Sequence, residues 1–358
     1  MNKKMKNYIL VINPGSTSTK IGLFNGDMPV FEENFHHNPE DLQEFSSILD
    51  QAPYRKTLIL NFLKKQNITP SSLKLVMARG GLLKPVVSGV YQVNKAMLND
   101  LVNAPKQHAS NLAAIIANDI ATENSIKAYI ADPVVVDELC ELARFTGHPE
   151  LKRISIFHAL NQKAVARKFA KKNAKKYDNL NLIIVHMGGG ITVGAHQKGK
   201  VIDVNQGFDG EGPFSPERTG TLPTGDLIKL AMSGKYTLEQ MQQFIVGKGG
   251  VNAYLGTNDM RIVENKALTD DNYKIVLDAM CFQIAKYIGA MATVLKGDVD
   301  AILLTGGIAY SKYVTEQLKD YTNYIATTEI YPGEDELEAL AFNGNLVLEN
   351  AINLKVYK

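Results

Sequence analysis

The fold is decided by residues 8–24, which read YILVINPGSTSTKIGLF. The apolar run YILVI is typical of a short buried strand, and KIGLF has strand character again after a polar interval. That interval concentrates small hydrogen-bond donors and one positive charge, from Asn13 through Ser16 and Ser18 to Lys20. The segment therefore predicts a strand, a polar turn and a second strand, followed by a further turn at residues 25–27.

The position of Lys20 argues against a Walker phosphate loop. In a Walker loop the lysine opens a helix, whereas Lys20 leads into a predicted strand. A tight turn between strands can still bind phosphate, because its backbone N–H groups form an anion-binding nest and nearby hydroxyl groups add donors. We therefore predict that this turn binds an anion.

Two later segments repeat the combination of an apolar strand and a glycine turn. Residues 181–204 read NLIIVHMGGGITVGAHQKGKVIDV, which predicts a strand, a turn at Gly188 to Gly190, a second strand and a hairpin. The chain therefore contains two related halves. In residues 300–318, DAILLTGGIAYSKYVTEQL, the pattern after the glycine pair becomes helical, and a strand that leads through glycines into a helix favours phosphate or nucleotide.

Composition limits the class of protein. With 358 residues, of which 45% are hydrophobic, we expect two domains with a cleft between them. The formal net charge is only +2 and the basic residues are dispersed, which argues against binding to nucleic acid or to a membrane surface. Cys140 and Cys281 have no metal or redox spacing, and the start MNKK with a short apolar run is no secretory signal. We expect no membrane span and a cytoplasmic location.

Helical periodicity accounts for much of the remaining chain. We predict helices in residues 108–121, with Ser110 or Asn111 as the cap, in residues 158–176, with a basic face in solvent, and near the C-terminus in residues 334–350. A long and mostly apolar helix over residues 272–295 is expected to be buried between layers or at a subunit contact.

Four of these segments together resemble the motifs of the acetokinase family. They read VINPGSTSTK from residue 11, IIVHMGGGITVGAH from 183, GFDGEGPFSPERTGTLPTGDL from 207 and ILLTGGIAYS from 302, and the pattern is most similar to the butyrate and branched-chain fatty-acid kinases. The resemblance implies an α/β, two-domain actin-like ATPase fold, related to ribonuclease H, with duplicated mixed sheets flanked by helices. It places the first domain in residues 1–136 plus 337–358 and the second, with the nucleotide site, in 137–336.

The resemblance implies reversible transfer of the γ-phosphoryl group of ATP to a short or branched-chain carboxylate such as butyrate, giving an acyl phosphate and ADP. It also implies Mg²⁺ as cofactor and a homodimer or higher homo-oligomer. The chemistry agrees, since a carboxylate with a pKa of about 4 to 5 is already an anionic nucleophile at neutral pH and needs no base. An acetate or propionate kinase and, more distantly, a non-catalytic ATP-binding sensor are the alternatives.

The resemblance also assigns residues to the nucleotide. Asn13 is expected near Mg²⁺, and His186 is expected to donate a hydrogen bond to an oxygen of the transferred phosphoryl group. The family motifs place two sets of residues at the phosphates of the nucleotide: Asn13, Ser16, Ser18 and Lys20; and Gly188, Gly189 and Gly190. They place a third set near its base and ribose: Gly306, Gly307 and Ile308.

Arg218 matches the arginine that stabilises the phosphoryl group in the transition state, and its planar fork suits that task. Arg79 is the candidate that anchors the substrate carboxylate, although acetate kinases carry this arginine earlier in the chain. Asp132 matches a catalytic aspartate of the family, or else forms a strand-end turn. The remaining substrate-binding candidates are two histidines near helix starts and one aromatic residue of an acyl pocket: His108, His158 and Phe157.

For Mg²⁺ we expect Glu336 beside Asn13, with Glu334 and Asp335 as alternatives, because Mg²⁺ keeps most of its waters and needs only one or two protein oxygens. The other histidines match no motif and are expected on the surface: His36, His37, His148 and His196.

Overall fold

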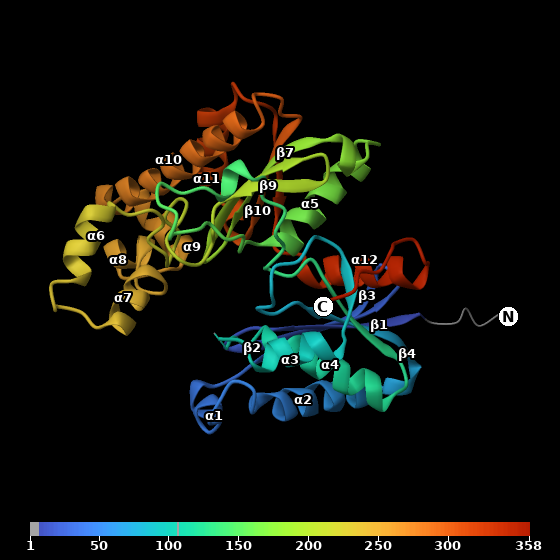
Figure 1. Cartoon of the computed structure of the whole chain (residues 1–358). Helices are drawn as coiled ribbons and strands as arrows, with labels where there is room; N and C mark the ends of the chain where they lie inside the picture. The colour runs from blue at the N-terminus through green and yellow to red at the C-terminus, as the bar shows by residue number, and fades with distance from the viewer. Residues whose placement is uncertain (1–6, 106) are drawn as a thin grey trace. The chain divides into compact units, whose positions relative to one another are not determined.

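The computed structural model describes residues 7–105 and 107–358, so the basic start of the chain lies outside the described residues. The chain forms two compact units. Unit 1 contains Met1–Val136 and Asp335–Lys358, and unit 2 contains Asp137–Glu334. Figure 1 shows both units along the chain from blue to red, with the last helix returning to the fold of the first segment.

Unit 1 is built on a mixed sheet of six strands in the order β3-β2-β1-β4-β6-β5, counted over the described residues. The strands β1, β2 and β3 are antiparallel neighbours, and β4 and β6 continue the sheet in parallel with β1. Their bounds are β1 Tyr8–Pro14, β2 Ser18–Asn25, β3 Met28–His36, β4 Leu73–Arg79, β5 Val90–Gln92 and β6 Lys127–Ala131. The predicted strand, turn and strand over residues 8–24 are therefore confirmed.

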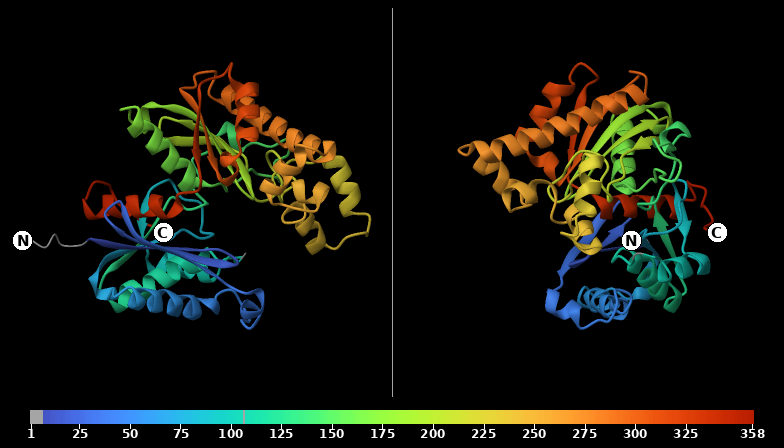
Figure 2. Two further views of the ribbon diagram at one scale, coloured as in Figure 1. Left: turned by 180° about the vertical axis from the view of Figure 1, so that it is seen from behind. Right: turned by 60° about the vertical axis from the view of Figure 1, so that its left-hand side comes forward.

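Helices cover both faces of this sheet. Alternate residues of β1 point to opposite sides, so Leu10 and Ile12 join a core with the helices of one face, while Ile9 packs against Gly344 of α12 on the other. Figure 2 shows α12 alone on its side of the sheet. The helices are α1 Pro39–Gln43, α2 Gln51–Lys65, α3 Lys95–Val102, α4 Asn111–Glu123 and α12 Glu336–Leu348.

Unit 2 repeats the plan with a sheet ordered β11-β10-β7-β8-β9. The strands β7, β8 and β9 are antiparallel neighbours, and β10 and β11 extend the sheet in parallel with β7. Their bounds are β7 Asn181–Met187, β8 Ile191–Gln197, β9 Lys200–Val204, β10 Ala301–Gly306 and β11 Thr328–Pro332. Each sheet thus begins with three antiparallel strands and adds parallel strands beside the first, which confirms the predicted duplication of mixed sheets flanked by helices.

The helices of unit 2 also lie on both faces of their sheet. Leu182 and Ile184 pack with residues of α5, whereas Ile183 and Val185 pack with residues of α10. The helices are α5 Ala159–Lys172, α6 Thr224–Ala231, α7 Leu238–Ile245, α8 Gly250–Leu255, α9 Met260–Ala267, α10 Asp271–Val294 and α11 Lys312–Thr322. The basic face of α5 is not wholly in solvent as predicted, because Lys163 is buried and its Nζ lies 2.7 Å from Glu138 Oε2.

The predicted long apolar helix is present as α10, but only 8 of its 24 residues are buried, so it is not enclosed between layers. Its residues Leu277, Met280 and Ile284 are fully buried in the core of unit 2. By length and composition alone, α10 is the one helix among the described residues that could cross a membrane. Half of the apolar stretch is buried within the fold, as in the core helix of a soluble protein.

Candidate active site

The turn between β1 and β2 consists of residues 15–17, and these residues together with Ser18, the first residue of β2, are called here the Ser16 turn. The side chains of Ser16 and Lys20 are exposed, and Ser18 is half-buried. In the described part of the chain Lys20 forms no ion pair, so its charge faces solvent beside the turn. The sequence prediction placed these residues at a turn between strands, and the structure brings them together there.

Arg55 of α2, which the sequence did not single out, lies under the Ser16 turn. Its side chain is fully buried, and Nη1 donates to the carbonyl oxygens of Gly15 at 3.0 Å and Ser18 at 2.8 Å. Nη2 approaches the carbonyl of Ser16 at 3.4 Å, and both Nε and Nη2 donate to Gln51 Oε1. All of these acceptors are uncharged. Burial lowers the pKa of Arg55 to about 10, which leaves it charged at neutral pH.

His37 also supports the turn, and the prediction that it lies on the surface is wrong. Its backbone N–H donates to Thr17 O at 2.9 Å, and its Nε2 lies 2.8 Å from Thr19 Oγ1. Thr19 Oγ1 accepts from Arg55 Nη1, so its proton is available to His37 Nε2. Burial and the charge of Arg55 lower the pKa of His37 to about 4, which keeps the ring neutral.

Asn13, Arg79 and Glu336 form a cluster in unit 1, called here the Glu336 cluster. Asn13 Nδ2 donates to Glu336 Oε2 at 2.6 Å, and Arg79 Nη1 donates to the same oxygen at 3.0 Å. Arg79 also approaches Asn13 Oδ1 at 3.3 Å. Of the three acidic candidates for a metal, Glu336 is therefore the one beside Asn13. Within the described residues, no three acidic, histidine or cysteine side chains are grouped to hold a metal ion.

Asp132 and His108 have local roles in the structure. Asp132 follows β6 in the left-handed region at φ 39°, and its Oδ1 accepts from Ser88 Oγ at 2.6 Å and from Gly89 N at 2.9 Å. These bonds match the turn-forming alternative for Asp132. His108 precedes α4, as predicted, and its Nδ1 accepts from the Ser110 N–H at 3.2 Å, which places the proton of a neutral ring on Nε2.

In unit 2 the turn between β7 and β8 consists of Gly188, Gly189 and Gly190 and is called here the Gly189 turn. A side chain at Gly190 would collide with the guanidinium of Arg218, and one at Gly188 would lie 3.2 Å from His186 Nε2. The backbone is closed by the Gly188 N–H, which donates to Gly190 O at 3.0 Å. Arg218 therefore requires a glycine at position 190, whereas Gly188 and Gly189 have less crowded neighbours, His186 and Glu217.

Arg218 is held by its neighbours and still has a free donor. Nη1 donates to Gly207 O, and the guanidinium carbon lies 5.0 Å from the centre of the Phe208 ring. Nε is buried and has no hydrogen-bond partner among the described residues. Burial lowers the pKa of Arg218, although Glu217 and Asp209 oppose this shift. An unsatisfied buried N–H beside a glycine turn is suited to an anionic ligand.

His158 and His186 are stacked, with ring centroids 3.7 Å apart and an interplanar angle of 10°. The Nδ2 of Asn161 donates to the backbone oxygen of Glu334, so Asn161 Oδ1 faces His186 Nδ1 at 2.8 Å. His186 must donate at Nδ1, and a neutral ring therefore accepts at Nε2. It donates from Nε2, as predicted from the sequence, only when the ring is protonated; Glu334 Oε1 lies 3.8 Å from that atom.

The tautomer of His158 follows from a buried chain of hydrogen bonds. Gln162 Nε2 donates to the backbone oxygen of Thr192 at 3.1 Å and to its Oγ1 at 2.9 Å. Thr192 Oγ1 therefore has its proton available for His158 Nδ1 at 2.9 Å, and with this donation a neutral His158 carries its own proton on Nε2. At the far end His196 Nε2 donates to Gln162 Oε1, so His196 is a buried network residue and its predicted surface position is wrong.

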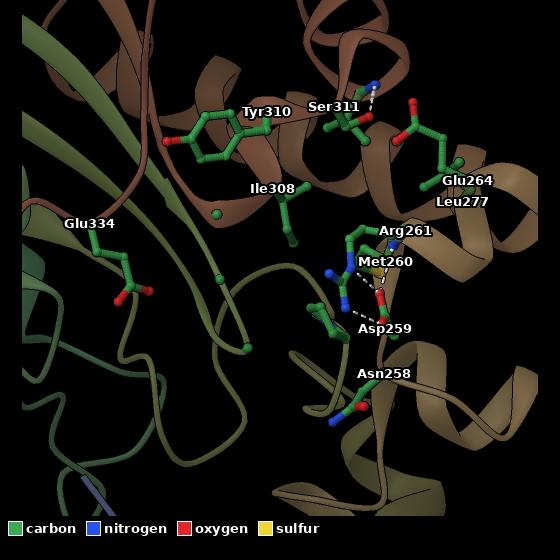
Figure 3. Close-up of a pocket in the computed structure, with 15 residues that line it drawn as sticks. Asn258, Asp259, Met260, Arg261, Glu264, Leu277, Ile308, Tyr310, Ser311 and Glu334 are labelled. Carbon is green, nitrogen blue, oxygen red and sulfur yellow. Dashed lines mark hydrogen bonds and ion pairs between the residues drawn. The ribbon is translucent and has the colours of Figure 1, made fainter. Parts of the chain in front are cut away.

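Unit 2 contains a pocket of about 460 Å³ that joins two of the predicted glycine turns. Gly188 and Gly189 line it, as do Gly307 and Ile308, while Gly306 lies outside its lining. Gly306 instead has φ 88°, and a side chain there would meet the backbone of Met187. Figure 3 shows Ile308, Met260 and Leu277 around the pocket together with the polar side chains of Asn258, Ser311 and Glu264.

Half of the pocket residues that the sequence did not identify lie before and within α9. Arg261 is fixed by Asp259, with Nη2 2.6 Å from Oδ2, and this hydrogen bond holds the pKa of Asp259 at about 2. The only local signal was the sequence NDMR at residues 258–261, which lacks the glycines used to find the other turns. An apolar floor with a few polar groups is typical of a ligand site.

The comparisons with known proteins bear on this geometry. The model of the acetokinase family matches residues 150–325. Butyrate kinase 1 of Clostridium acetobutylicum is 54% identical over 352 residues, which are 98% of this chain and 99% of that protein. The chain belongs to the acetokinase family.

Other comparisons support the same assignment for this acetokinase-family chain. Butyrate kinase 2 of Clostridium acetobutylicum is 51% identical and covers 99% of this chain and 100% of that protein. The crystal structure of acetate kinase from Porphyromonas gingivalis matches with a TM-score of 0.78 at 18% identity, over 95% of this chain and 100% of that one. This match shows the predicted actin-like ATPase fold, and the family of kinases implies the use of ATP.

Proposed function

We propose that the chain is a butyrate kinase, which transfers the γ-phosphoryl group of ATP reversibly to butyrate and gives butyryl phosphate and ADP. The observation that carries the proposal is the identity of more than half of all residues, over nearly the whole length, with butyrate kinase 1. The pocket of unit 2 supports it, because Gly307 and Ile308 line a cavity large enough for a nucleoside beside the Gly189 turn.

In the proposed reaction a carboxylate oxygen of butyrate attacks the γ-phosphorus of ATP. The new oxygen–phosphorus bond forms as the bond to the bridging oxygen of ADP breaks, and no proton has to be removed from the carboxylate. The task of the protein is to position two anions and to offset the charge of the transferred group. Arg218 is proposed to donate to that group, because its buried Nε has no other partner among the described residues.

The stacked histidines are proposed to supply one N–H donor without an added charge. Thr192 fixes the proton of neutral His158 on Nε2, so this ring can donate to a phosphoryl oxygen. His186 adds a donor at Nε2 when its ring is protonated. Phe157, which is buried, and His108 are proposed to contribute to butyrate binding.

In each unit, donors at the turn between the first two strands of the sheet are proposed to bind phosphate. In unit 1 these are Ser16, Ser18 and Lys20, and in unit 2 they are the glycine N–H groups. Asn13 and Glu336 are proposed to hold Mg²⁺, largely through water, since Arg79 already occupies the nearest oxygen of Glu336. When bound, the ion supplies positive charge to the phosphate oxygens. Arg79 is proposed to anchor the carboxylate of butyrate or to hold the Glu336 cluster together.

The test is ADP formation by the purified chain with ATP, Mg²⁺ and a panel of straight and branched acids from C2 to C5, with acyl phosphate trapped as the hydroxamate. We expect the highest kcat/KM with butyrate or a branched relative, with overlap between neighbouring chain lengths because one methylene contributes only about 1 to 3 kcal/mol. Arg218→Ala purified in parallel controls for contaminating kinases. A maximum at acetate or propionate would support the other kinase activities, and no acid-dependent ADP formation would support an ATP-binding sensor.

A homodimer and a cytoplasmic location complete the proposal. Light scattering coupled to size-exclusion chromatography would measure a mass of about twice 39.4 kDa for the dimer. A larger multiple of this mass would support the higher homo-oligomer, whereas a monomer would contradict this part of the proposal, and neither result would affect the proposed reaction.

A further inference from the structure

Arg55 is an unusual buried charge. Its relative exposure is 0%, yet no carboxylate forms an ion pair with it in the residues that the structure describes. A buried arginine is ordinarily paired with an anion, because transfer of an uncompensated charge from water into the interior is costly. The acceptors of Arg55 are instead three backbone carbonyls, one hydroxyl and one amide.

The carbonyls belong to the Ser16 turn. Nη1 and Nη2 reach the oxygens of Gly15, Ser16 and Ser18, which draws these oxygens toward the guanidinium on the inner side of the turn. Hydroxyl groups of Ser16 and Ser18 remain outside this set of bonds. The side chain thus removes acceptors, which would repel a phosphate, from the outer surface of the turn.

The acidic side chain nearest to this group, Asp41, raises the pKa of His37 but has no resolved effect on that of Arg55. His37, the titratable side chain that shares Thr19 with Arg55, is neutral. Lys20 adds a second positive charge on the exposed side of the same turn. An anion at the Ser16 turn would therefore be attracted by two cations at once, one in solvent and one in the low-dielectric interior, where electrostatic interactions are screened less.

We propose that Arg55 is a positioning residue for the phosphates of ATP, which acts by turning the carbonyls of the Ser16 turn inward and by leaving its own charge to be compensated by the bound nucleotide. This inference rests on the proposed function for the identity of the anion. It does not place Arg55 in contact with the nucleotide, because the turn lies between them.

The experiment compares Arg55→Met, which removes the charge and all donors, with Arg55→Lys, which keeps the charge but has no fork to bind three carbonyls. Lys56→Met is the matched control, because it removes a cation from the same helix whose partner, Glu123, lies 2.6 Å away. The measurements are the affinity for MgATP by calorimetry, the KM values for ATP and butyrate, and the melting temperature with and without MgATP.

We expect Arg55→Met to weaken ATP binding by about tenfold to a hundredfold, the range for hydrogen bonds to a charged group, and to lose most of the rise in melting temperature that MgATP causes. The KM for butyrate should change much less, Arg55→Lys should recover part of the loss, and Lys56→Met should resemble the unmodified chain.

Two results would overturn the proposal. One is an Arg55→Met protein that melts earlier but binds MgATP as tightly as before, since this indicates a purely structural arginine. The second result applies if Arg55→Met does not fold. In that case, an Arg55→Lys protein that binds ATP with unchanged affinity would overturn the proposal. Failure of the proposed function is distinguishable, because it would appear in the unmodified chain as no ATP binding or no phosphorylation of butyrate.

Discussion

The Ser16 turn and the Gly189 turn occupy equivalent positions, because each joins the first two strands of its sheet. The contacts that stabilise the two turns are different. The Ser16 turn has hydroxyl side chains, and its carbonyl oxygens accept hydrogen bonds from the buried Arg55. The Gly189 turn has no side chains, and a Cβ at Gly190 would collide with Arg218, while one at Gly189 or Gly188 would press on Glu217 or His186. One turn therefore carries its own donors, and the other makes room for donors from elsewhere.

The largest expected effect comes from removing the donor that the Gly189 turn accommodates. Arg218→Ala should lower kcat by about 10³-fold, the scale of an arginine that offsets charge on a transferred phosphoryl group, and should leave nucleotide affinity nearly unchanged. Steady-state kinetics and calorimetry with ADP measure the two quantities. Arg144→Ala, at an exposed ion pair with Asp137, is the control. An equal loss of nucleotide binding would contradict the role given to Arg218.

The contrast between the turns predicts opposite tolerance of a methyl group. Gly190→Ala should lower kcat by about tenfold or more, because the added Cβ displaces the guanidinium of Arg218. Gly15→Ala should stay within about twofold of the unmodified chain, since its nearest atom, Ser18 Oγ, would lie 3.5 Å away. Equal losses in the two variants would show that the turns are not supported differently.

A smaller effect is expected at the stacked histidines. Thr192→Val removes the hydroxyl that fixes the tautomer of His158, and we expect kcat to fall by about tenfold or less. Long-range ¹⁵N–¹H spectra should report His158 protonated at Nε2 in the unmodified chain and a mixture in the variant. Thr322→Val, at a buried threonine bonded within α11, is the control. If His158 is protonated at Nδ1 in the unmodified chain, the derived hydrogen-bond chain is incorrect.

The smallest effect concerns stability below neutral pH. The folded pKa of His37 is about 4, below its ordinary 6.5, so the unfolded chain binds a proton in this interval that the folded chain does not. Stability should therefore fall as the pH falls from 6.5 to 4, and buried His196 adds to the same trend because its pKa is also lowered. The urea midpoint of His37→Gln should depend less on pH than that of the exposed-site control His36→Gln.

The sequence was sufficient for features that depend on neighbouring residues. The strands around both turns follow from short apolar runs, and the two glycine-rich motifs contain four residues that line the pocket of unit 2: Gly188, Gly189, Gly307 and Ile308. The sequence could not predict the burial of Arg55, His37 and Lys163, because each has the pattern of a surface residue in its own segment. Their burial is decided by distant partners, such as the turn carbonyls 37 to 40 residues from Arg55.

The order of the two units along the chain has a consequence for synthesis. Unit 2 is one continuous segment, Asp137–Glu334, whereas unit 1 needs its final residues from Asp335 onward. Until α12 leaves the ribosome, one face of the first sheet, including Ile9 and Met77, lacks the helix that covers it. The part of the protein made first is therefore the part completed last, and a nascent chain stalled before residue 335 would expose that apolar face to chaperones.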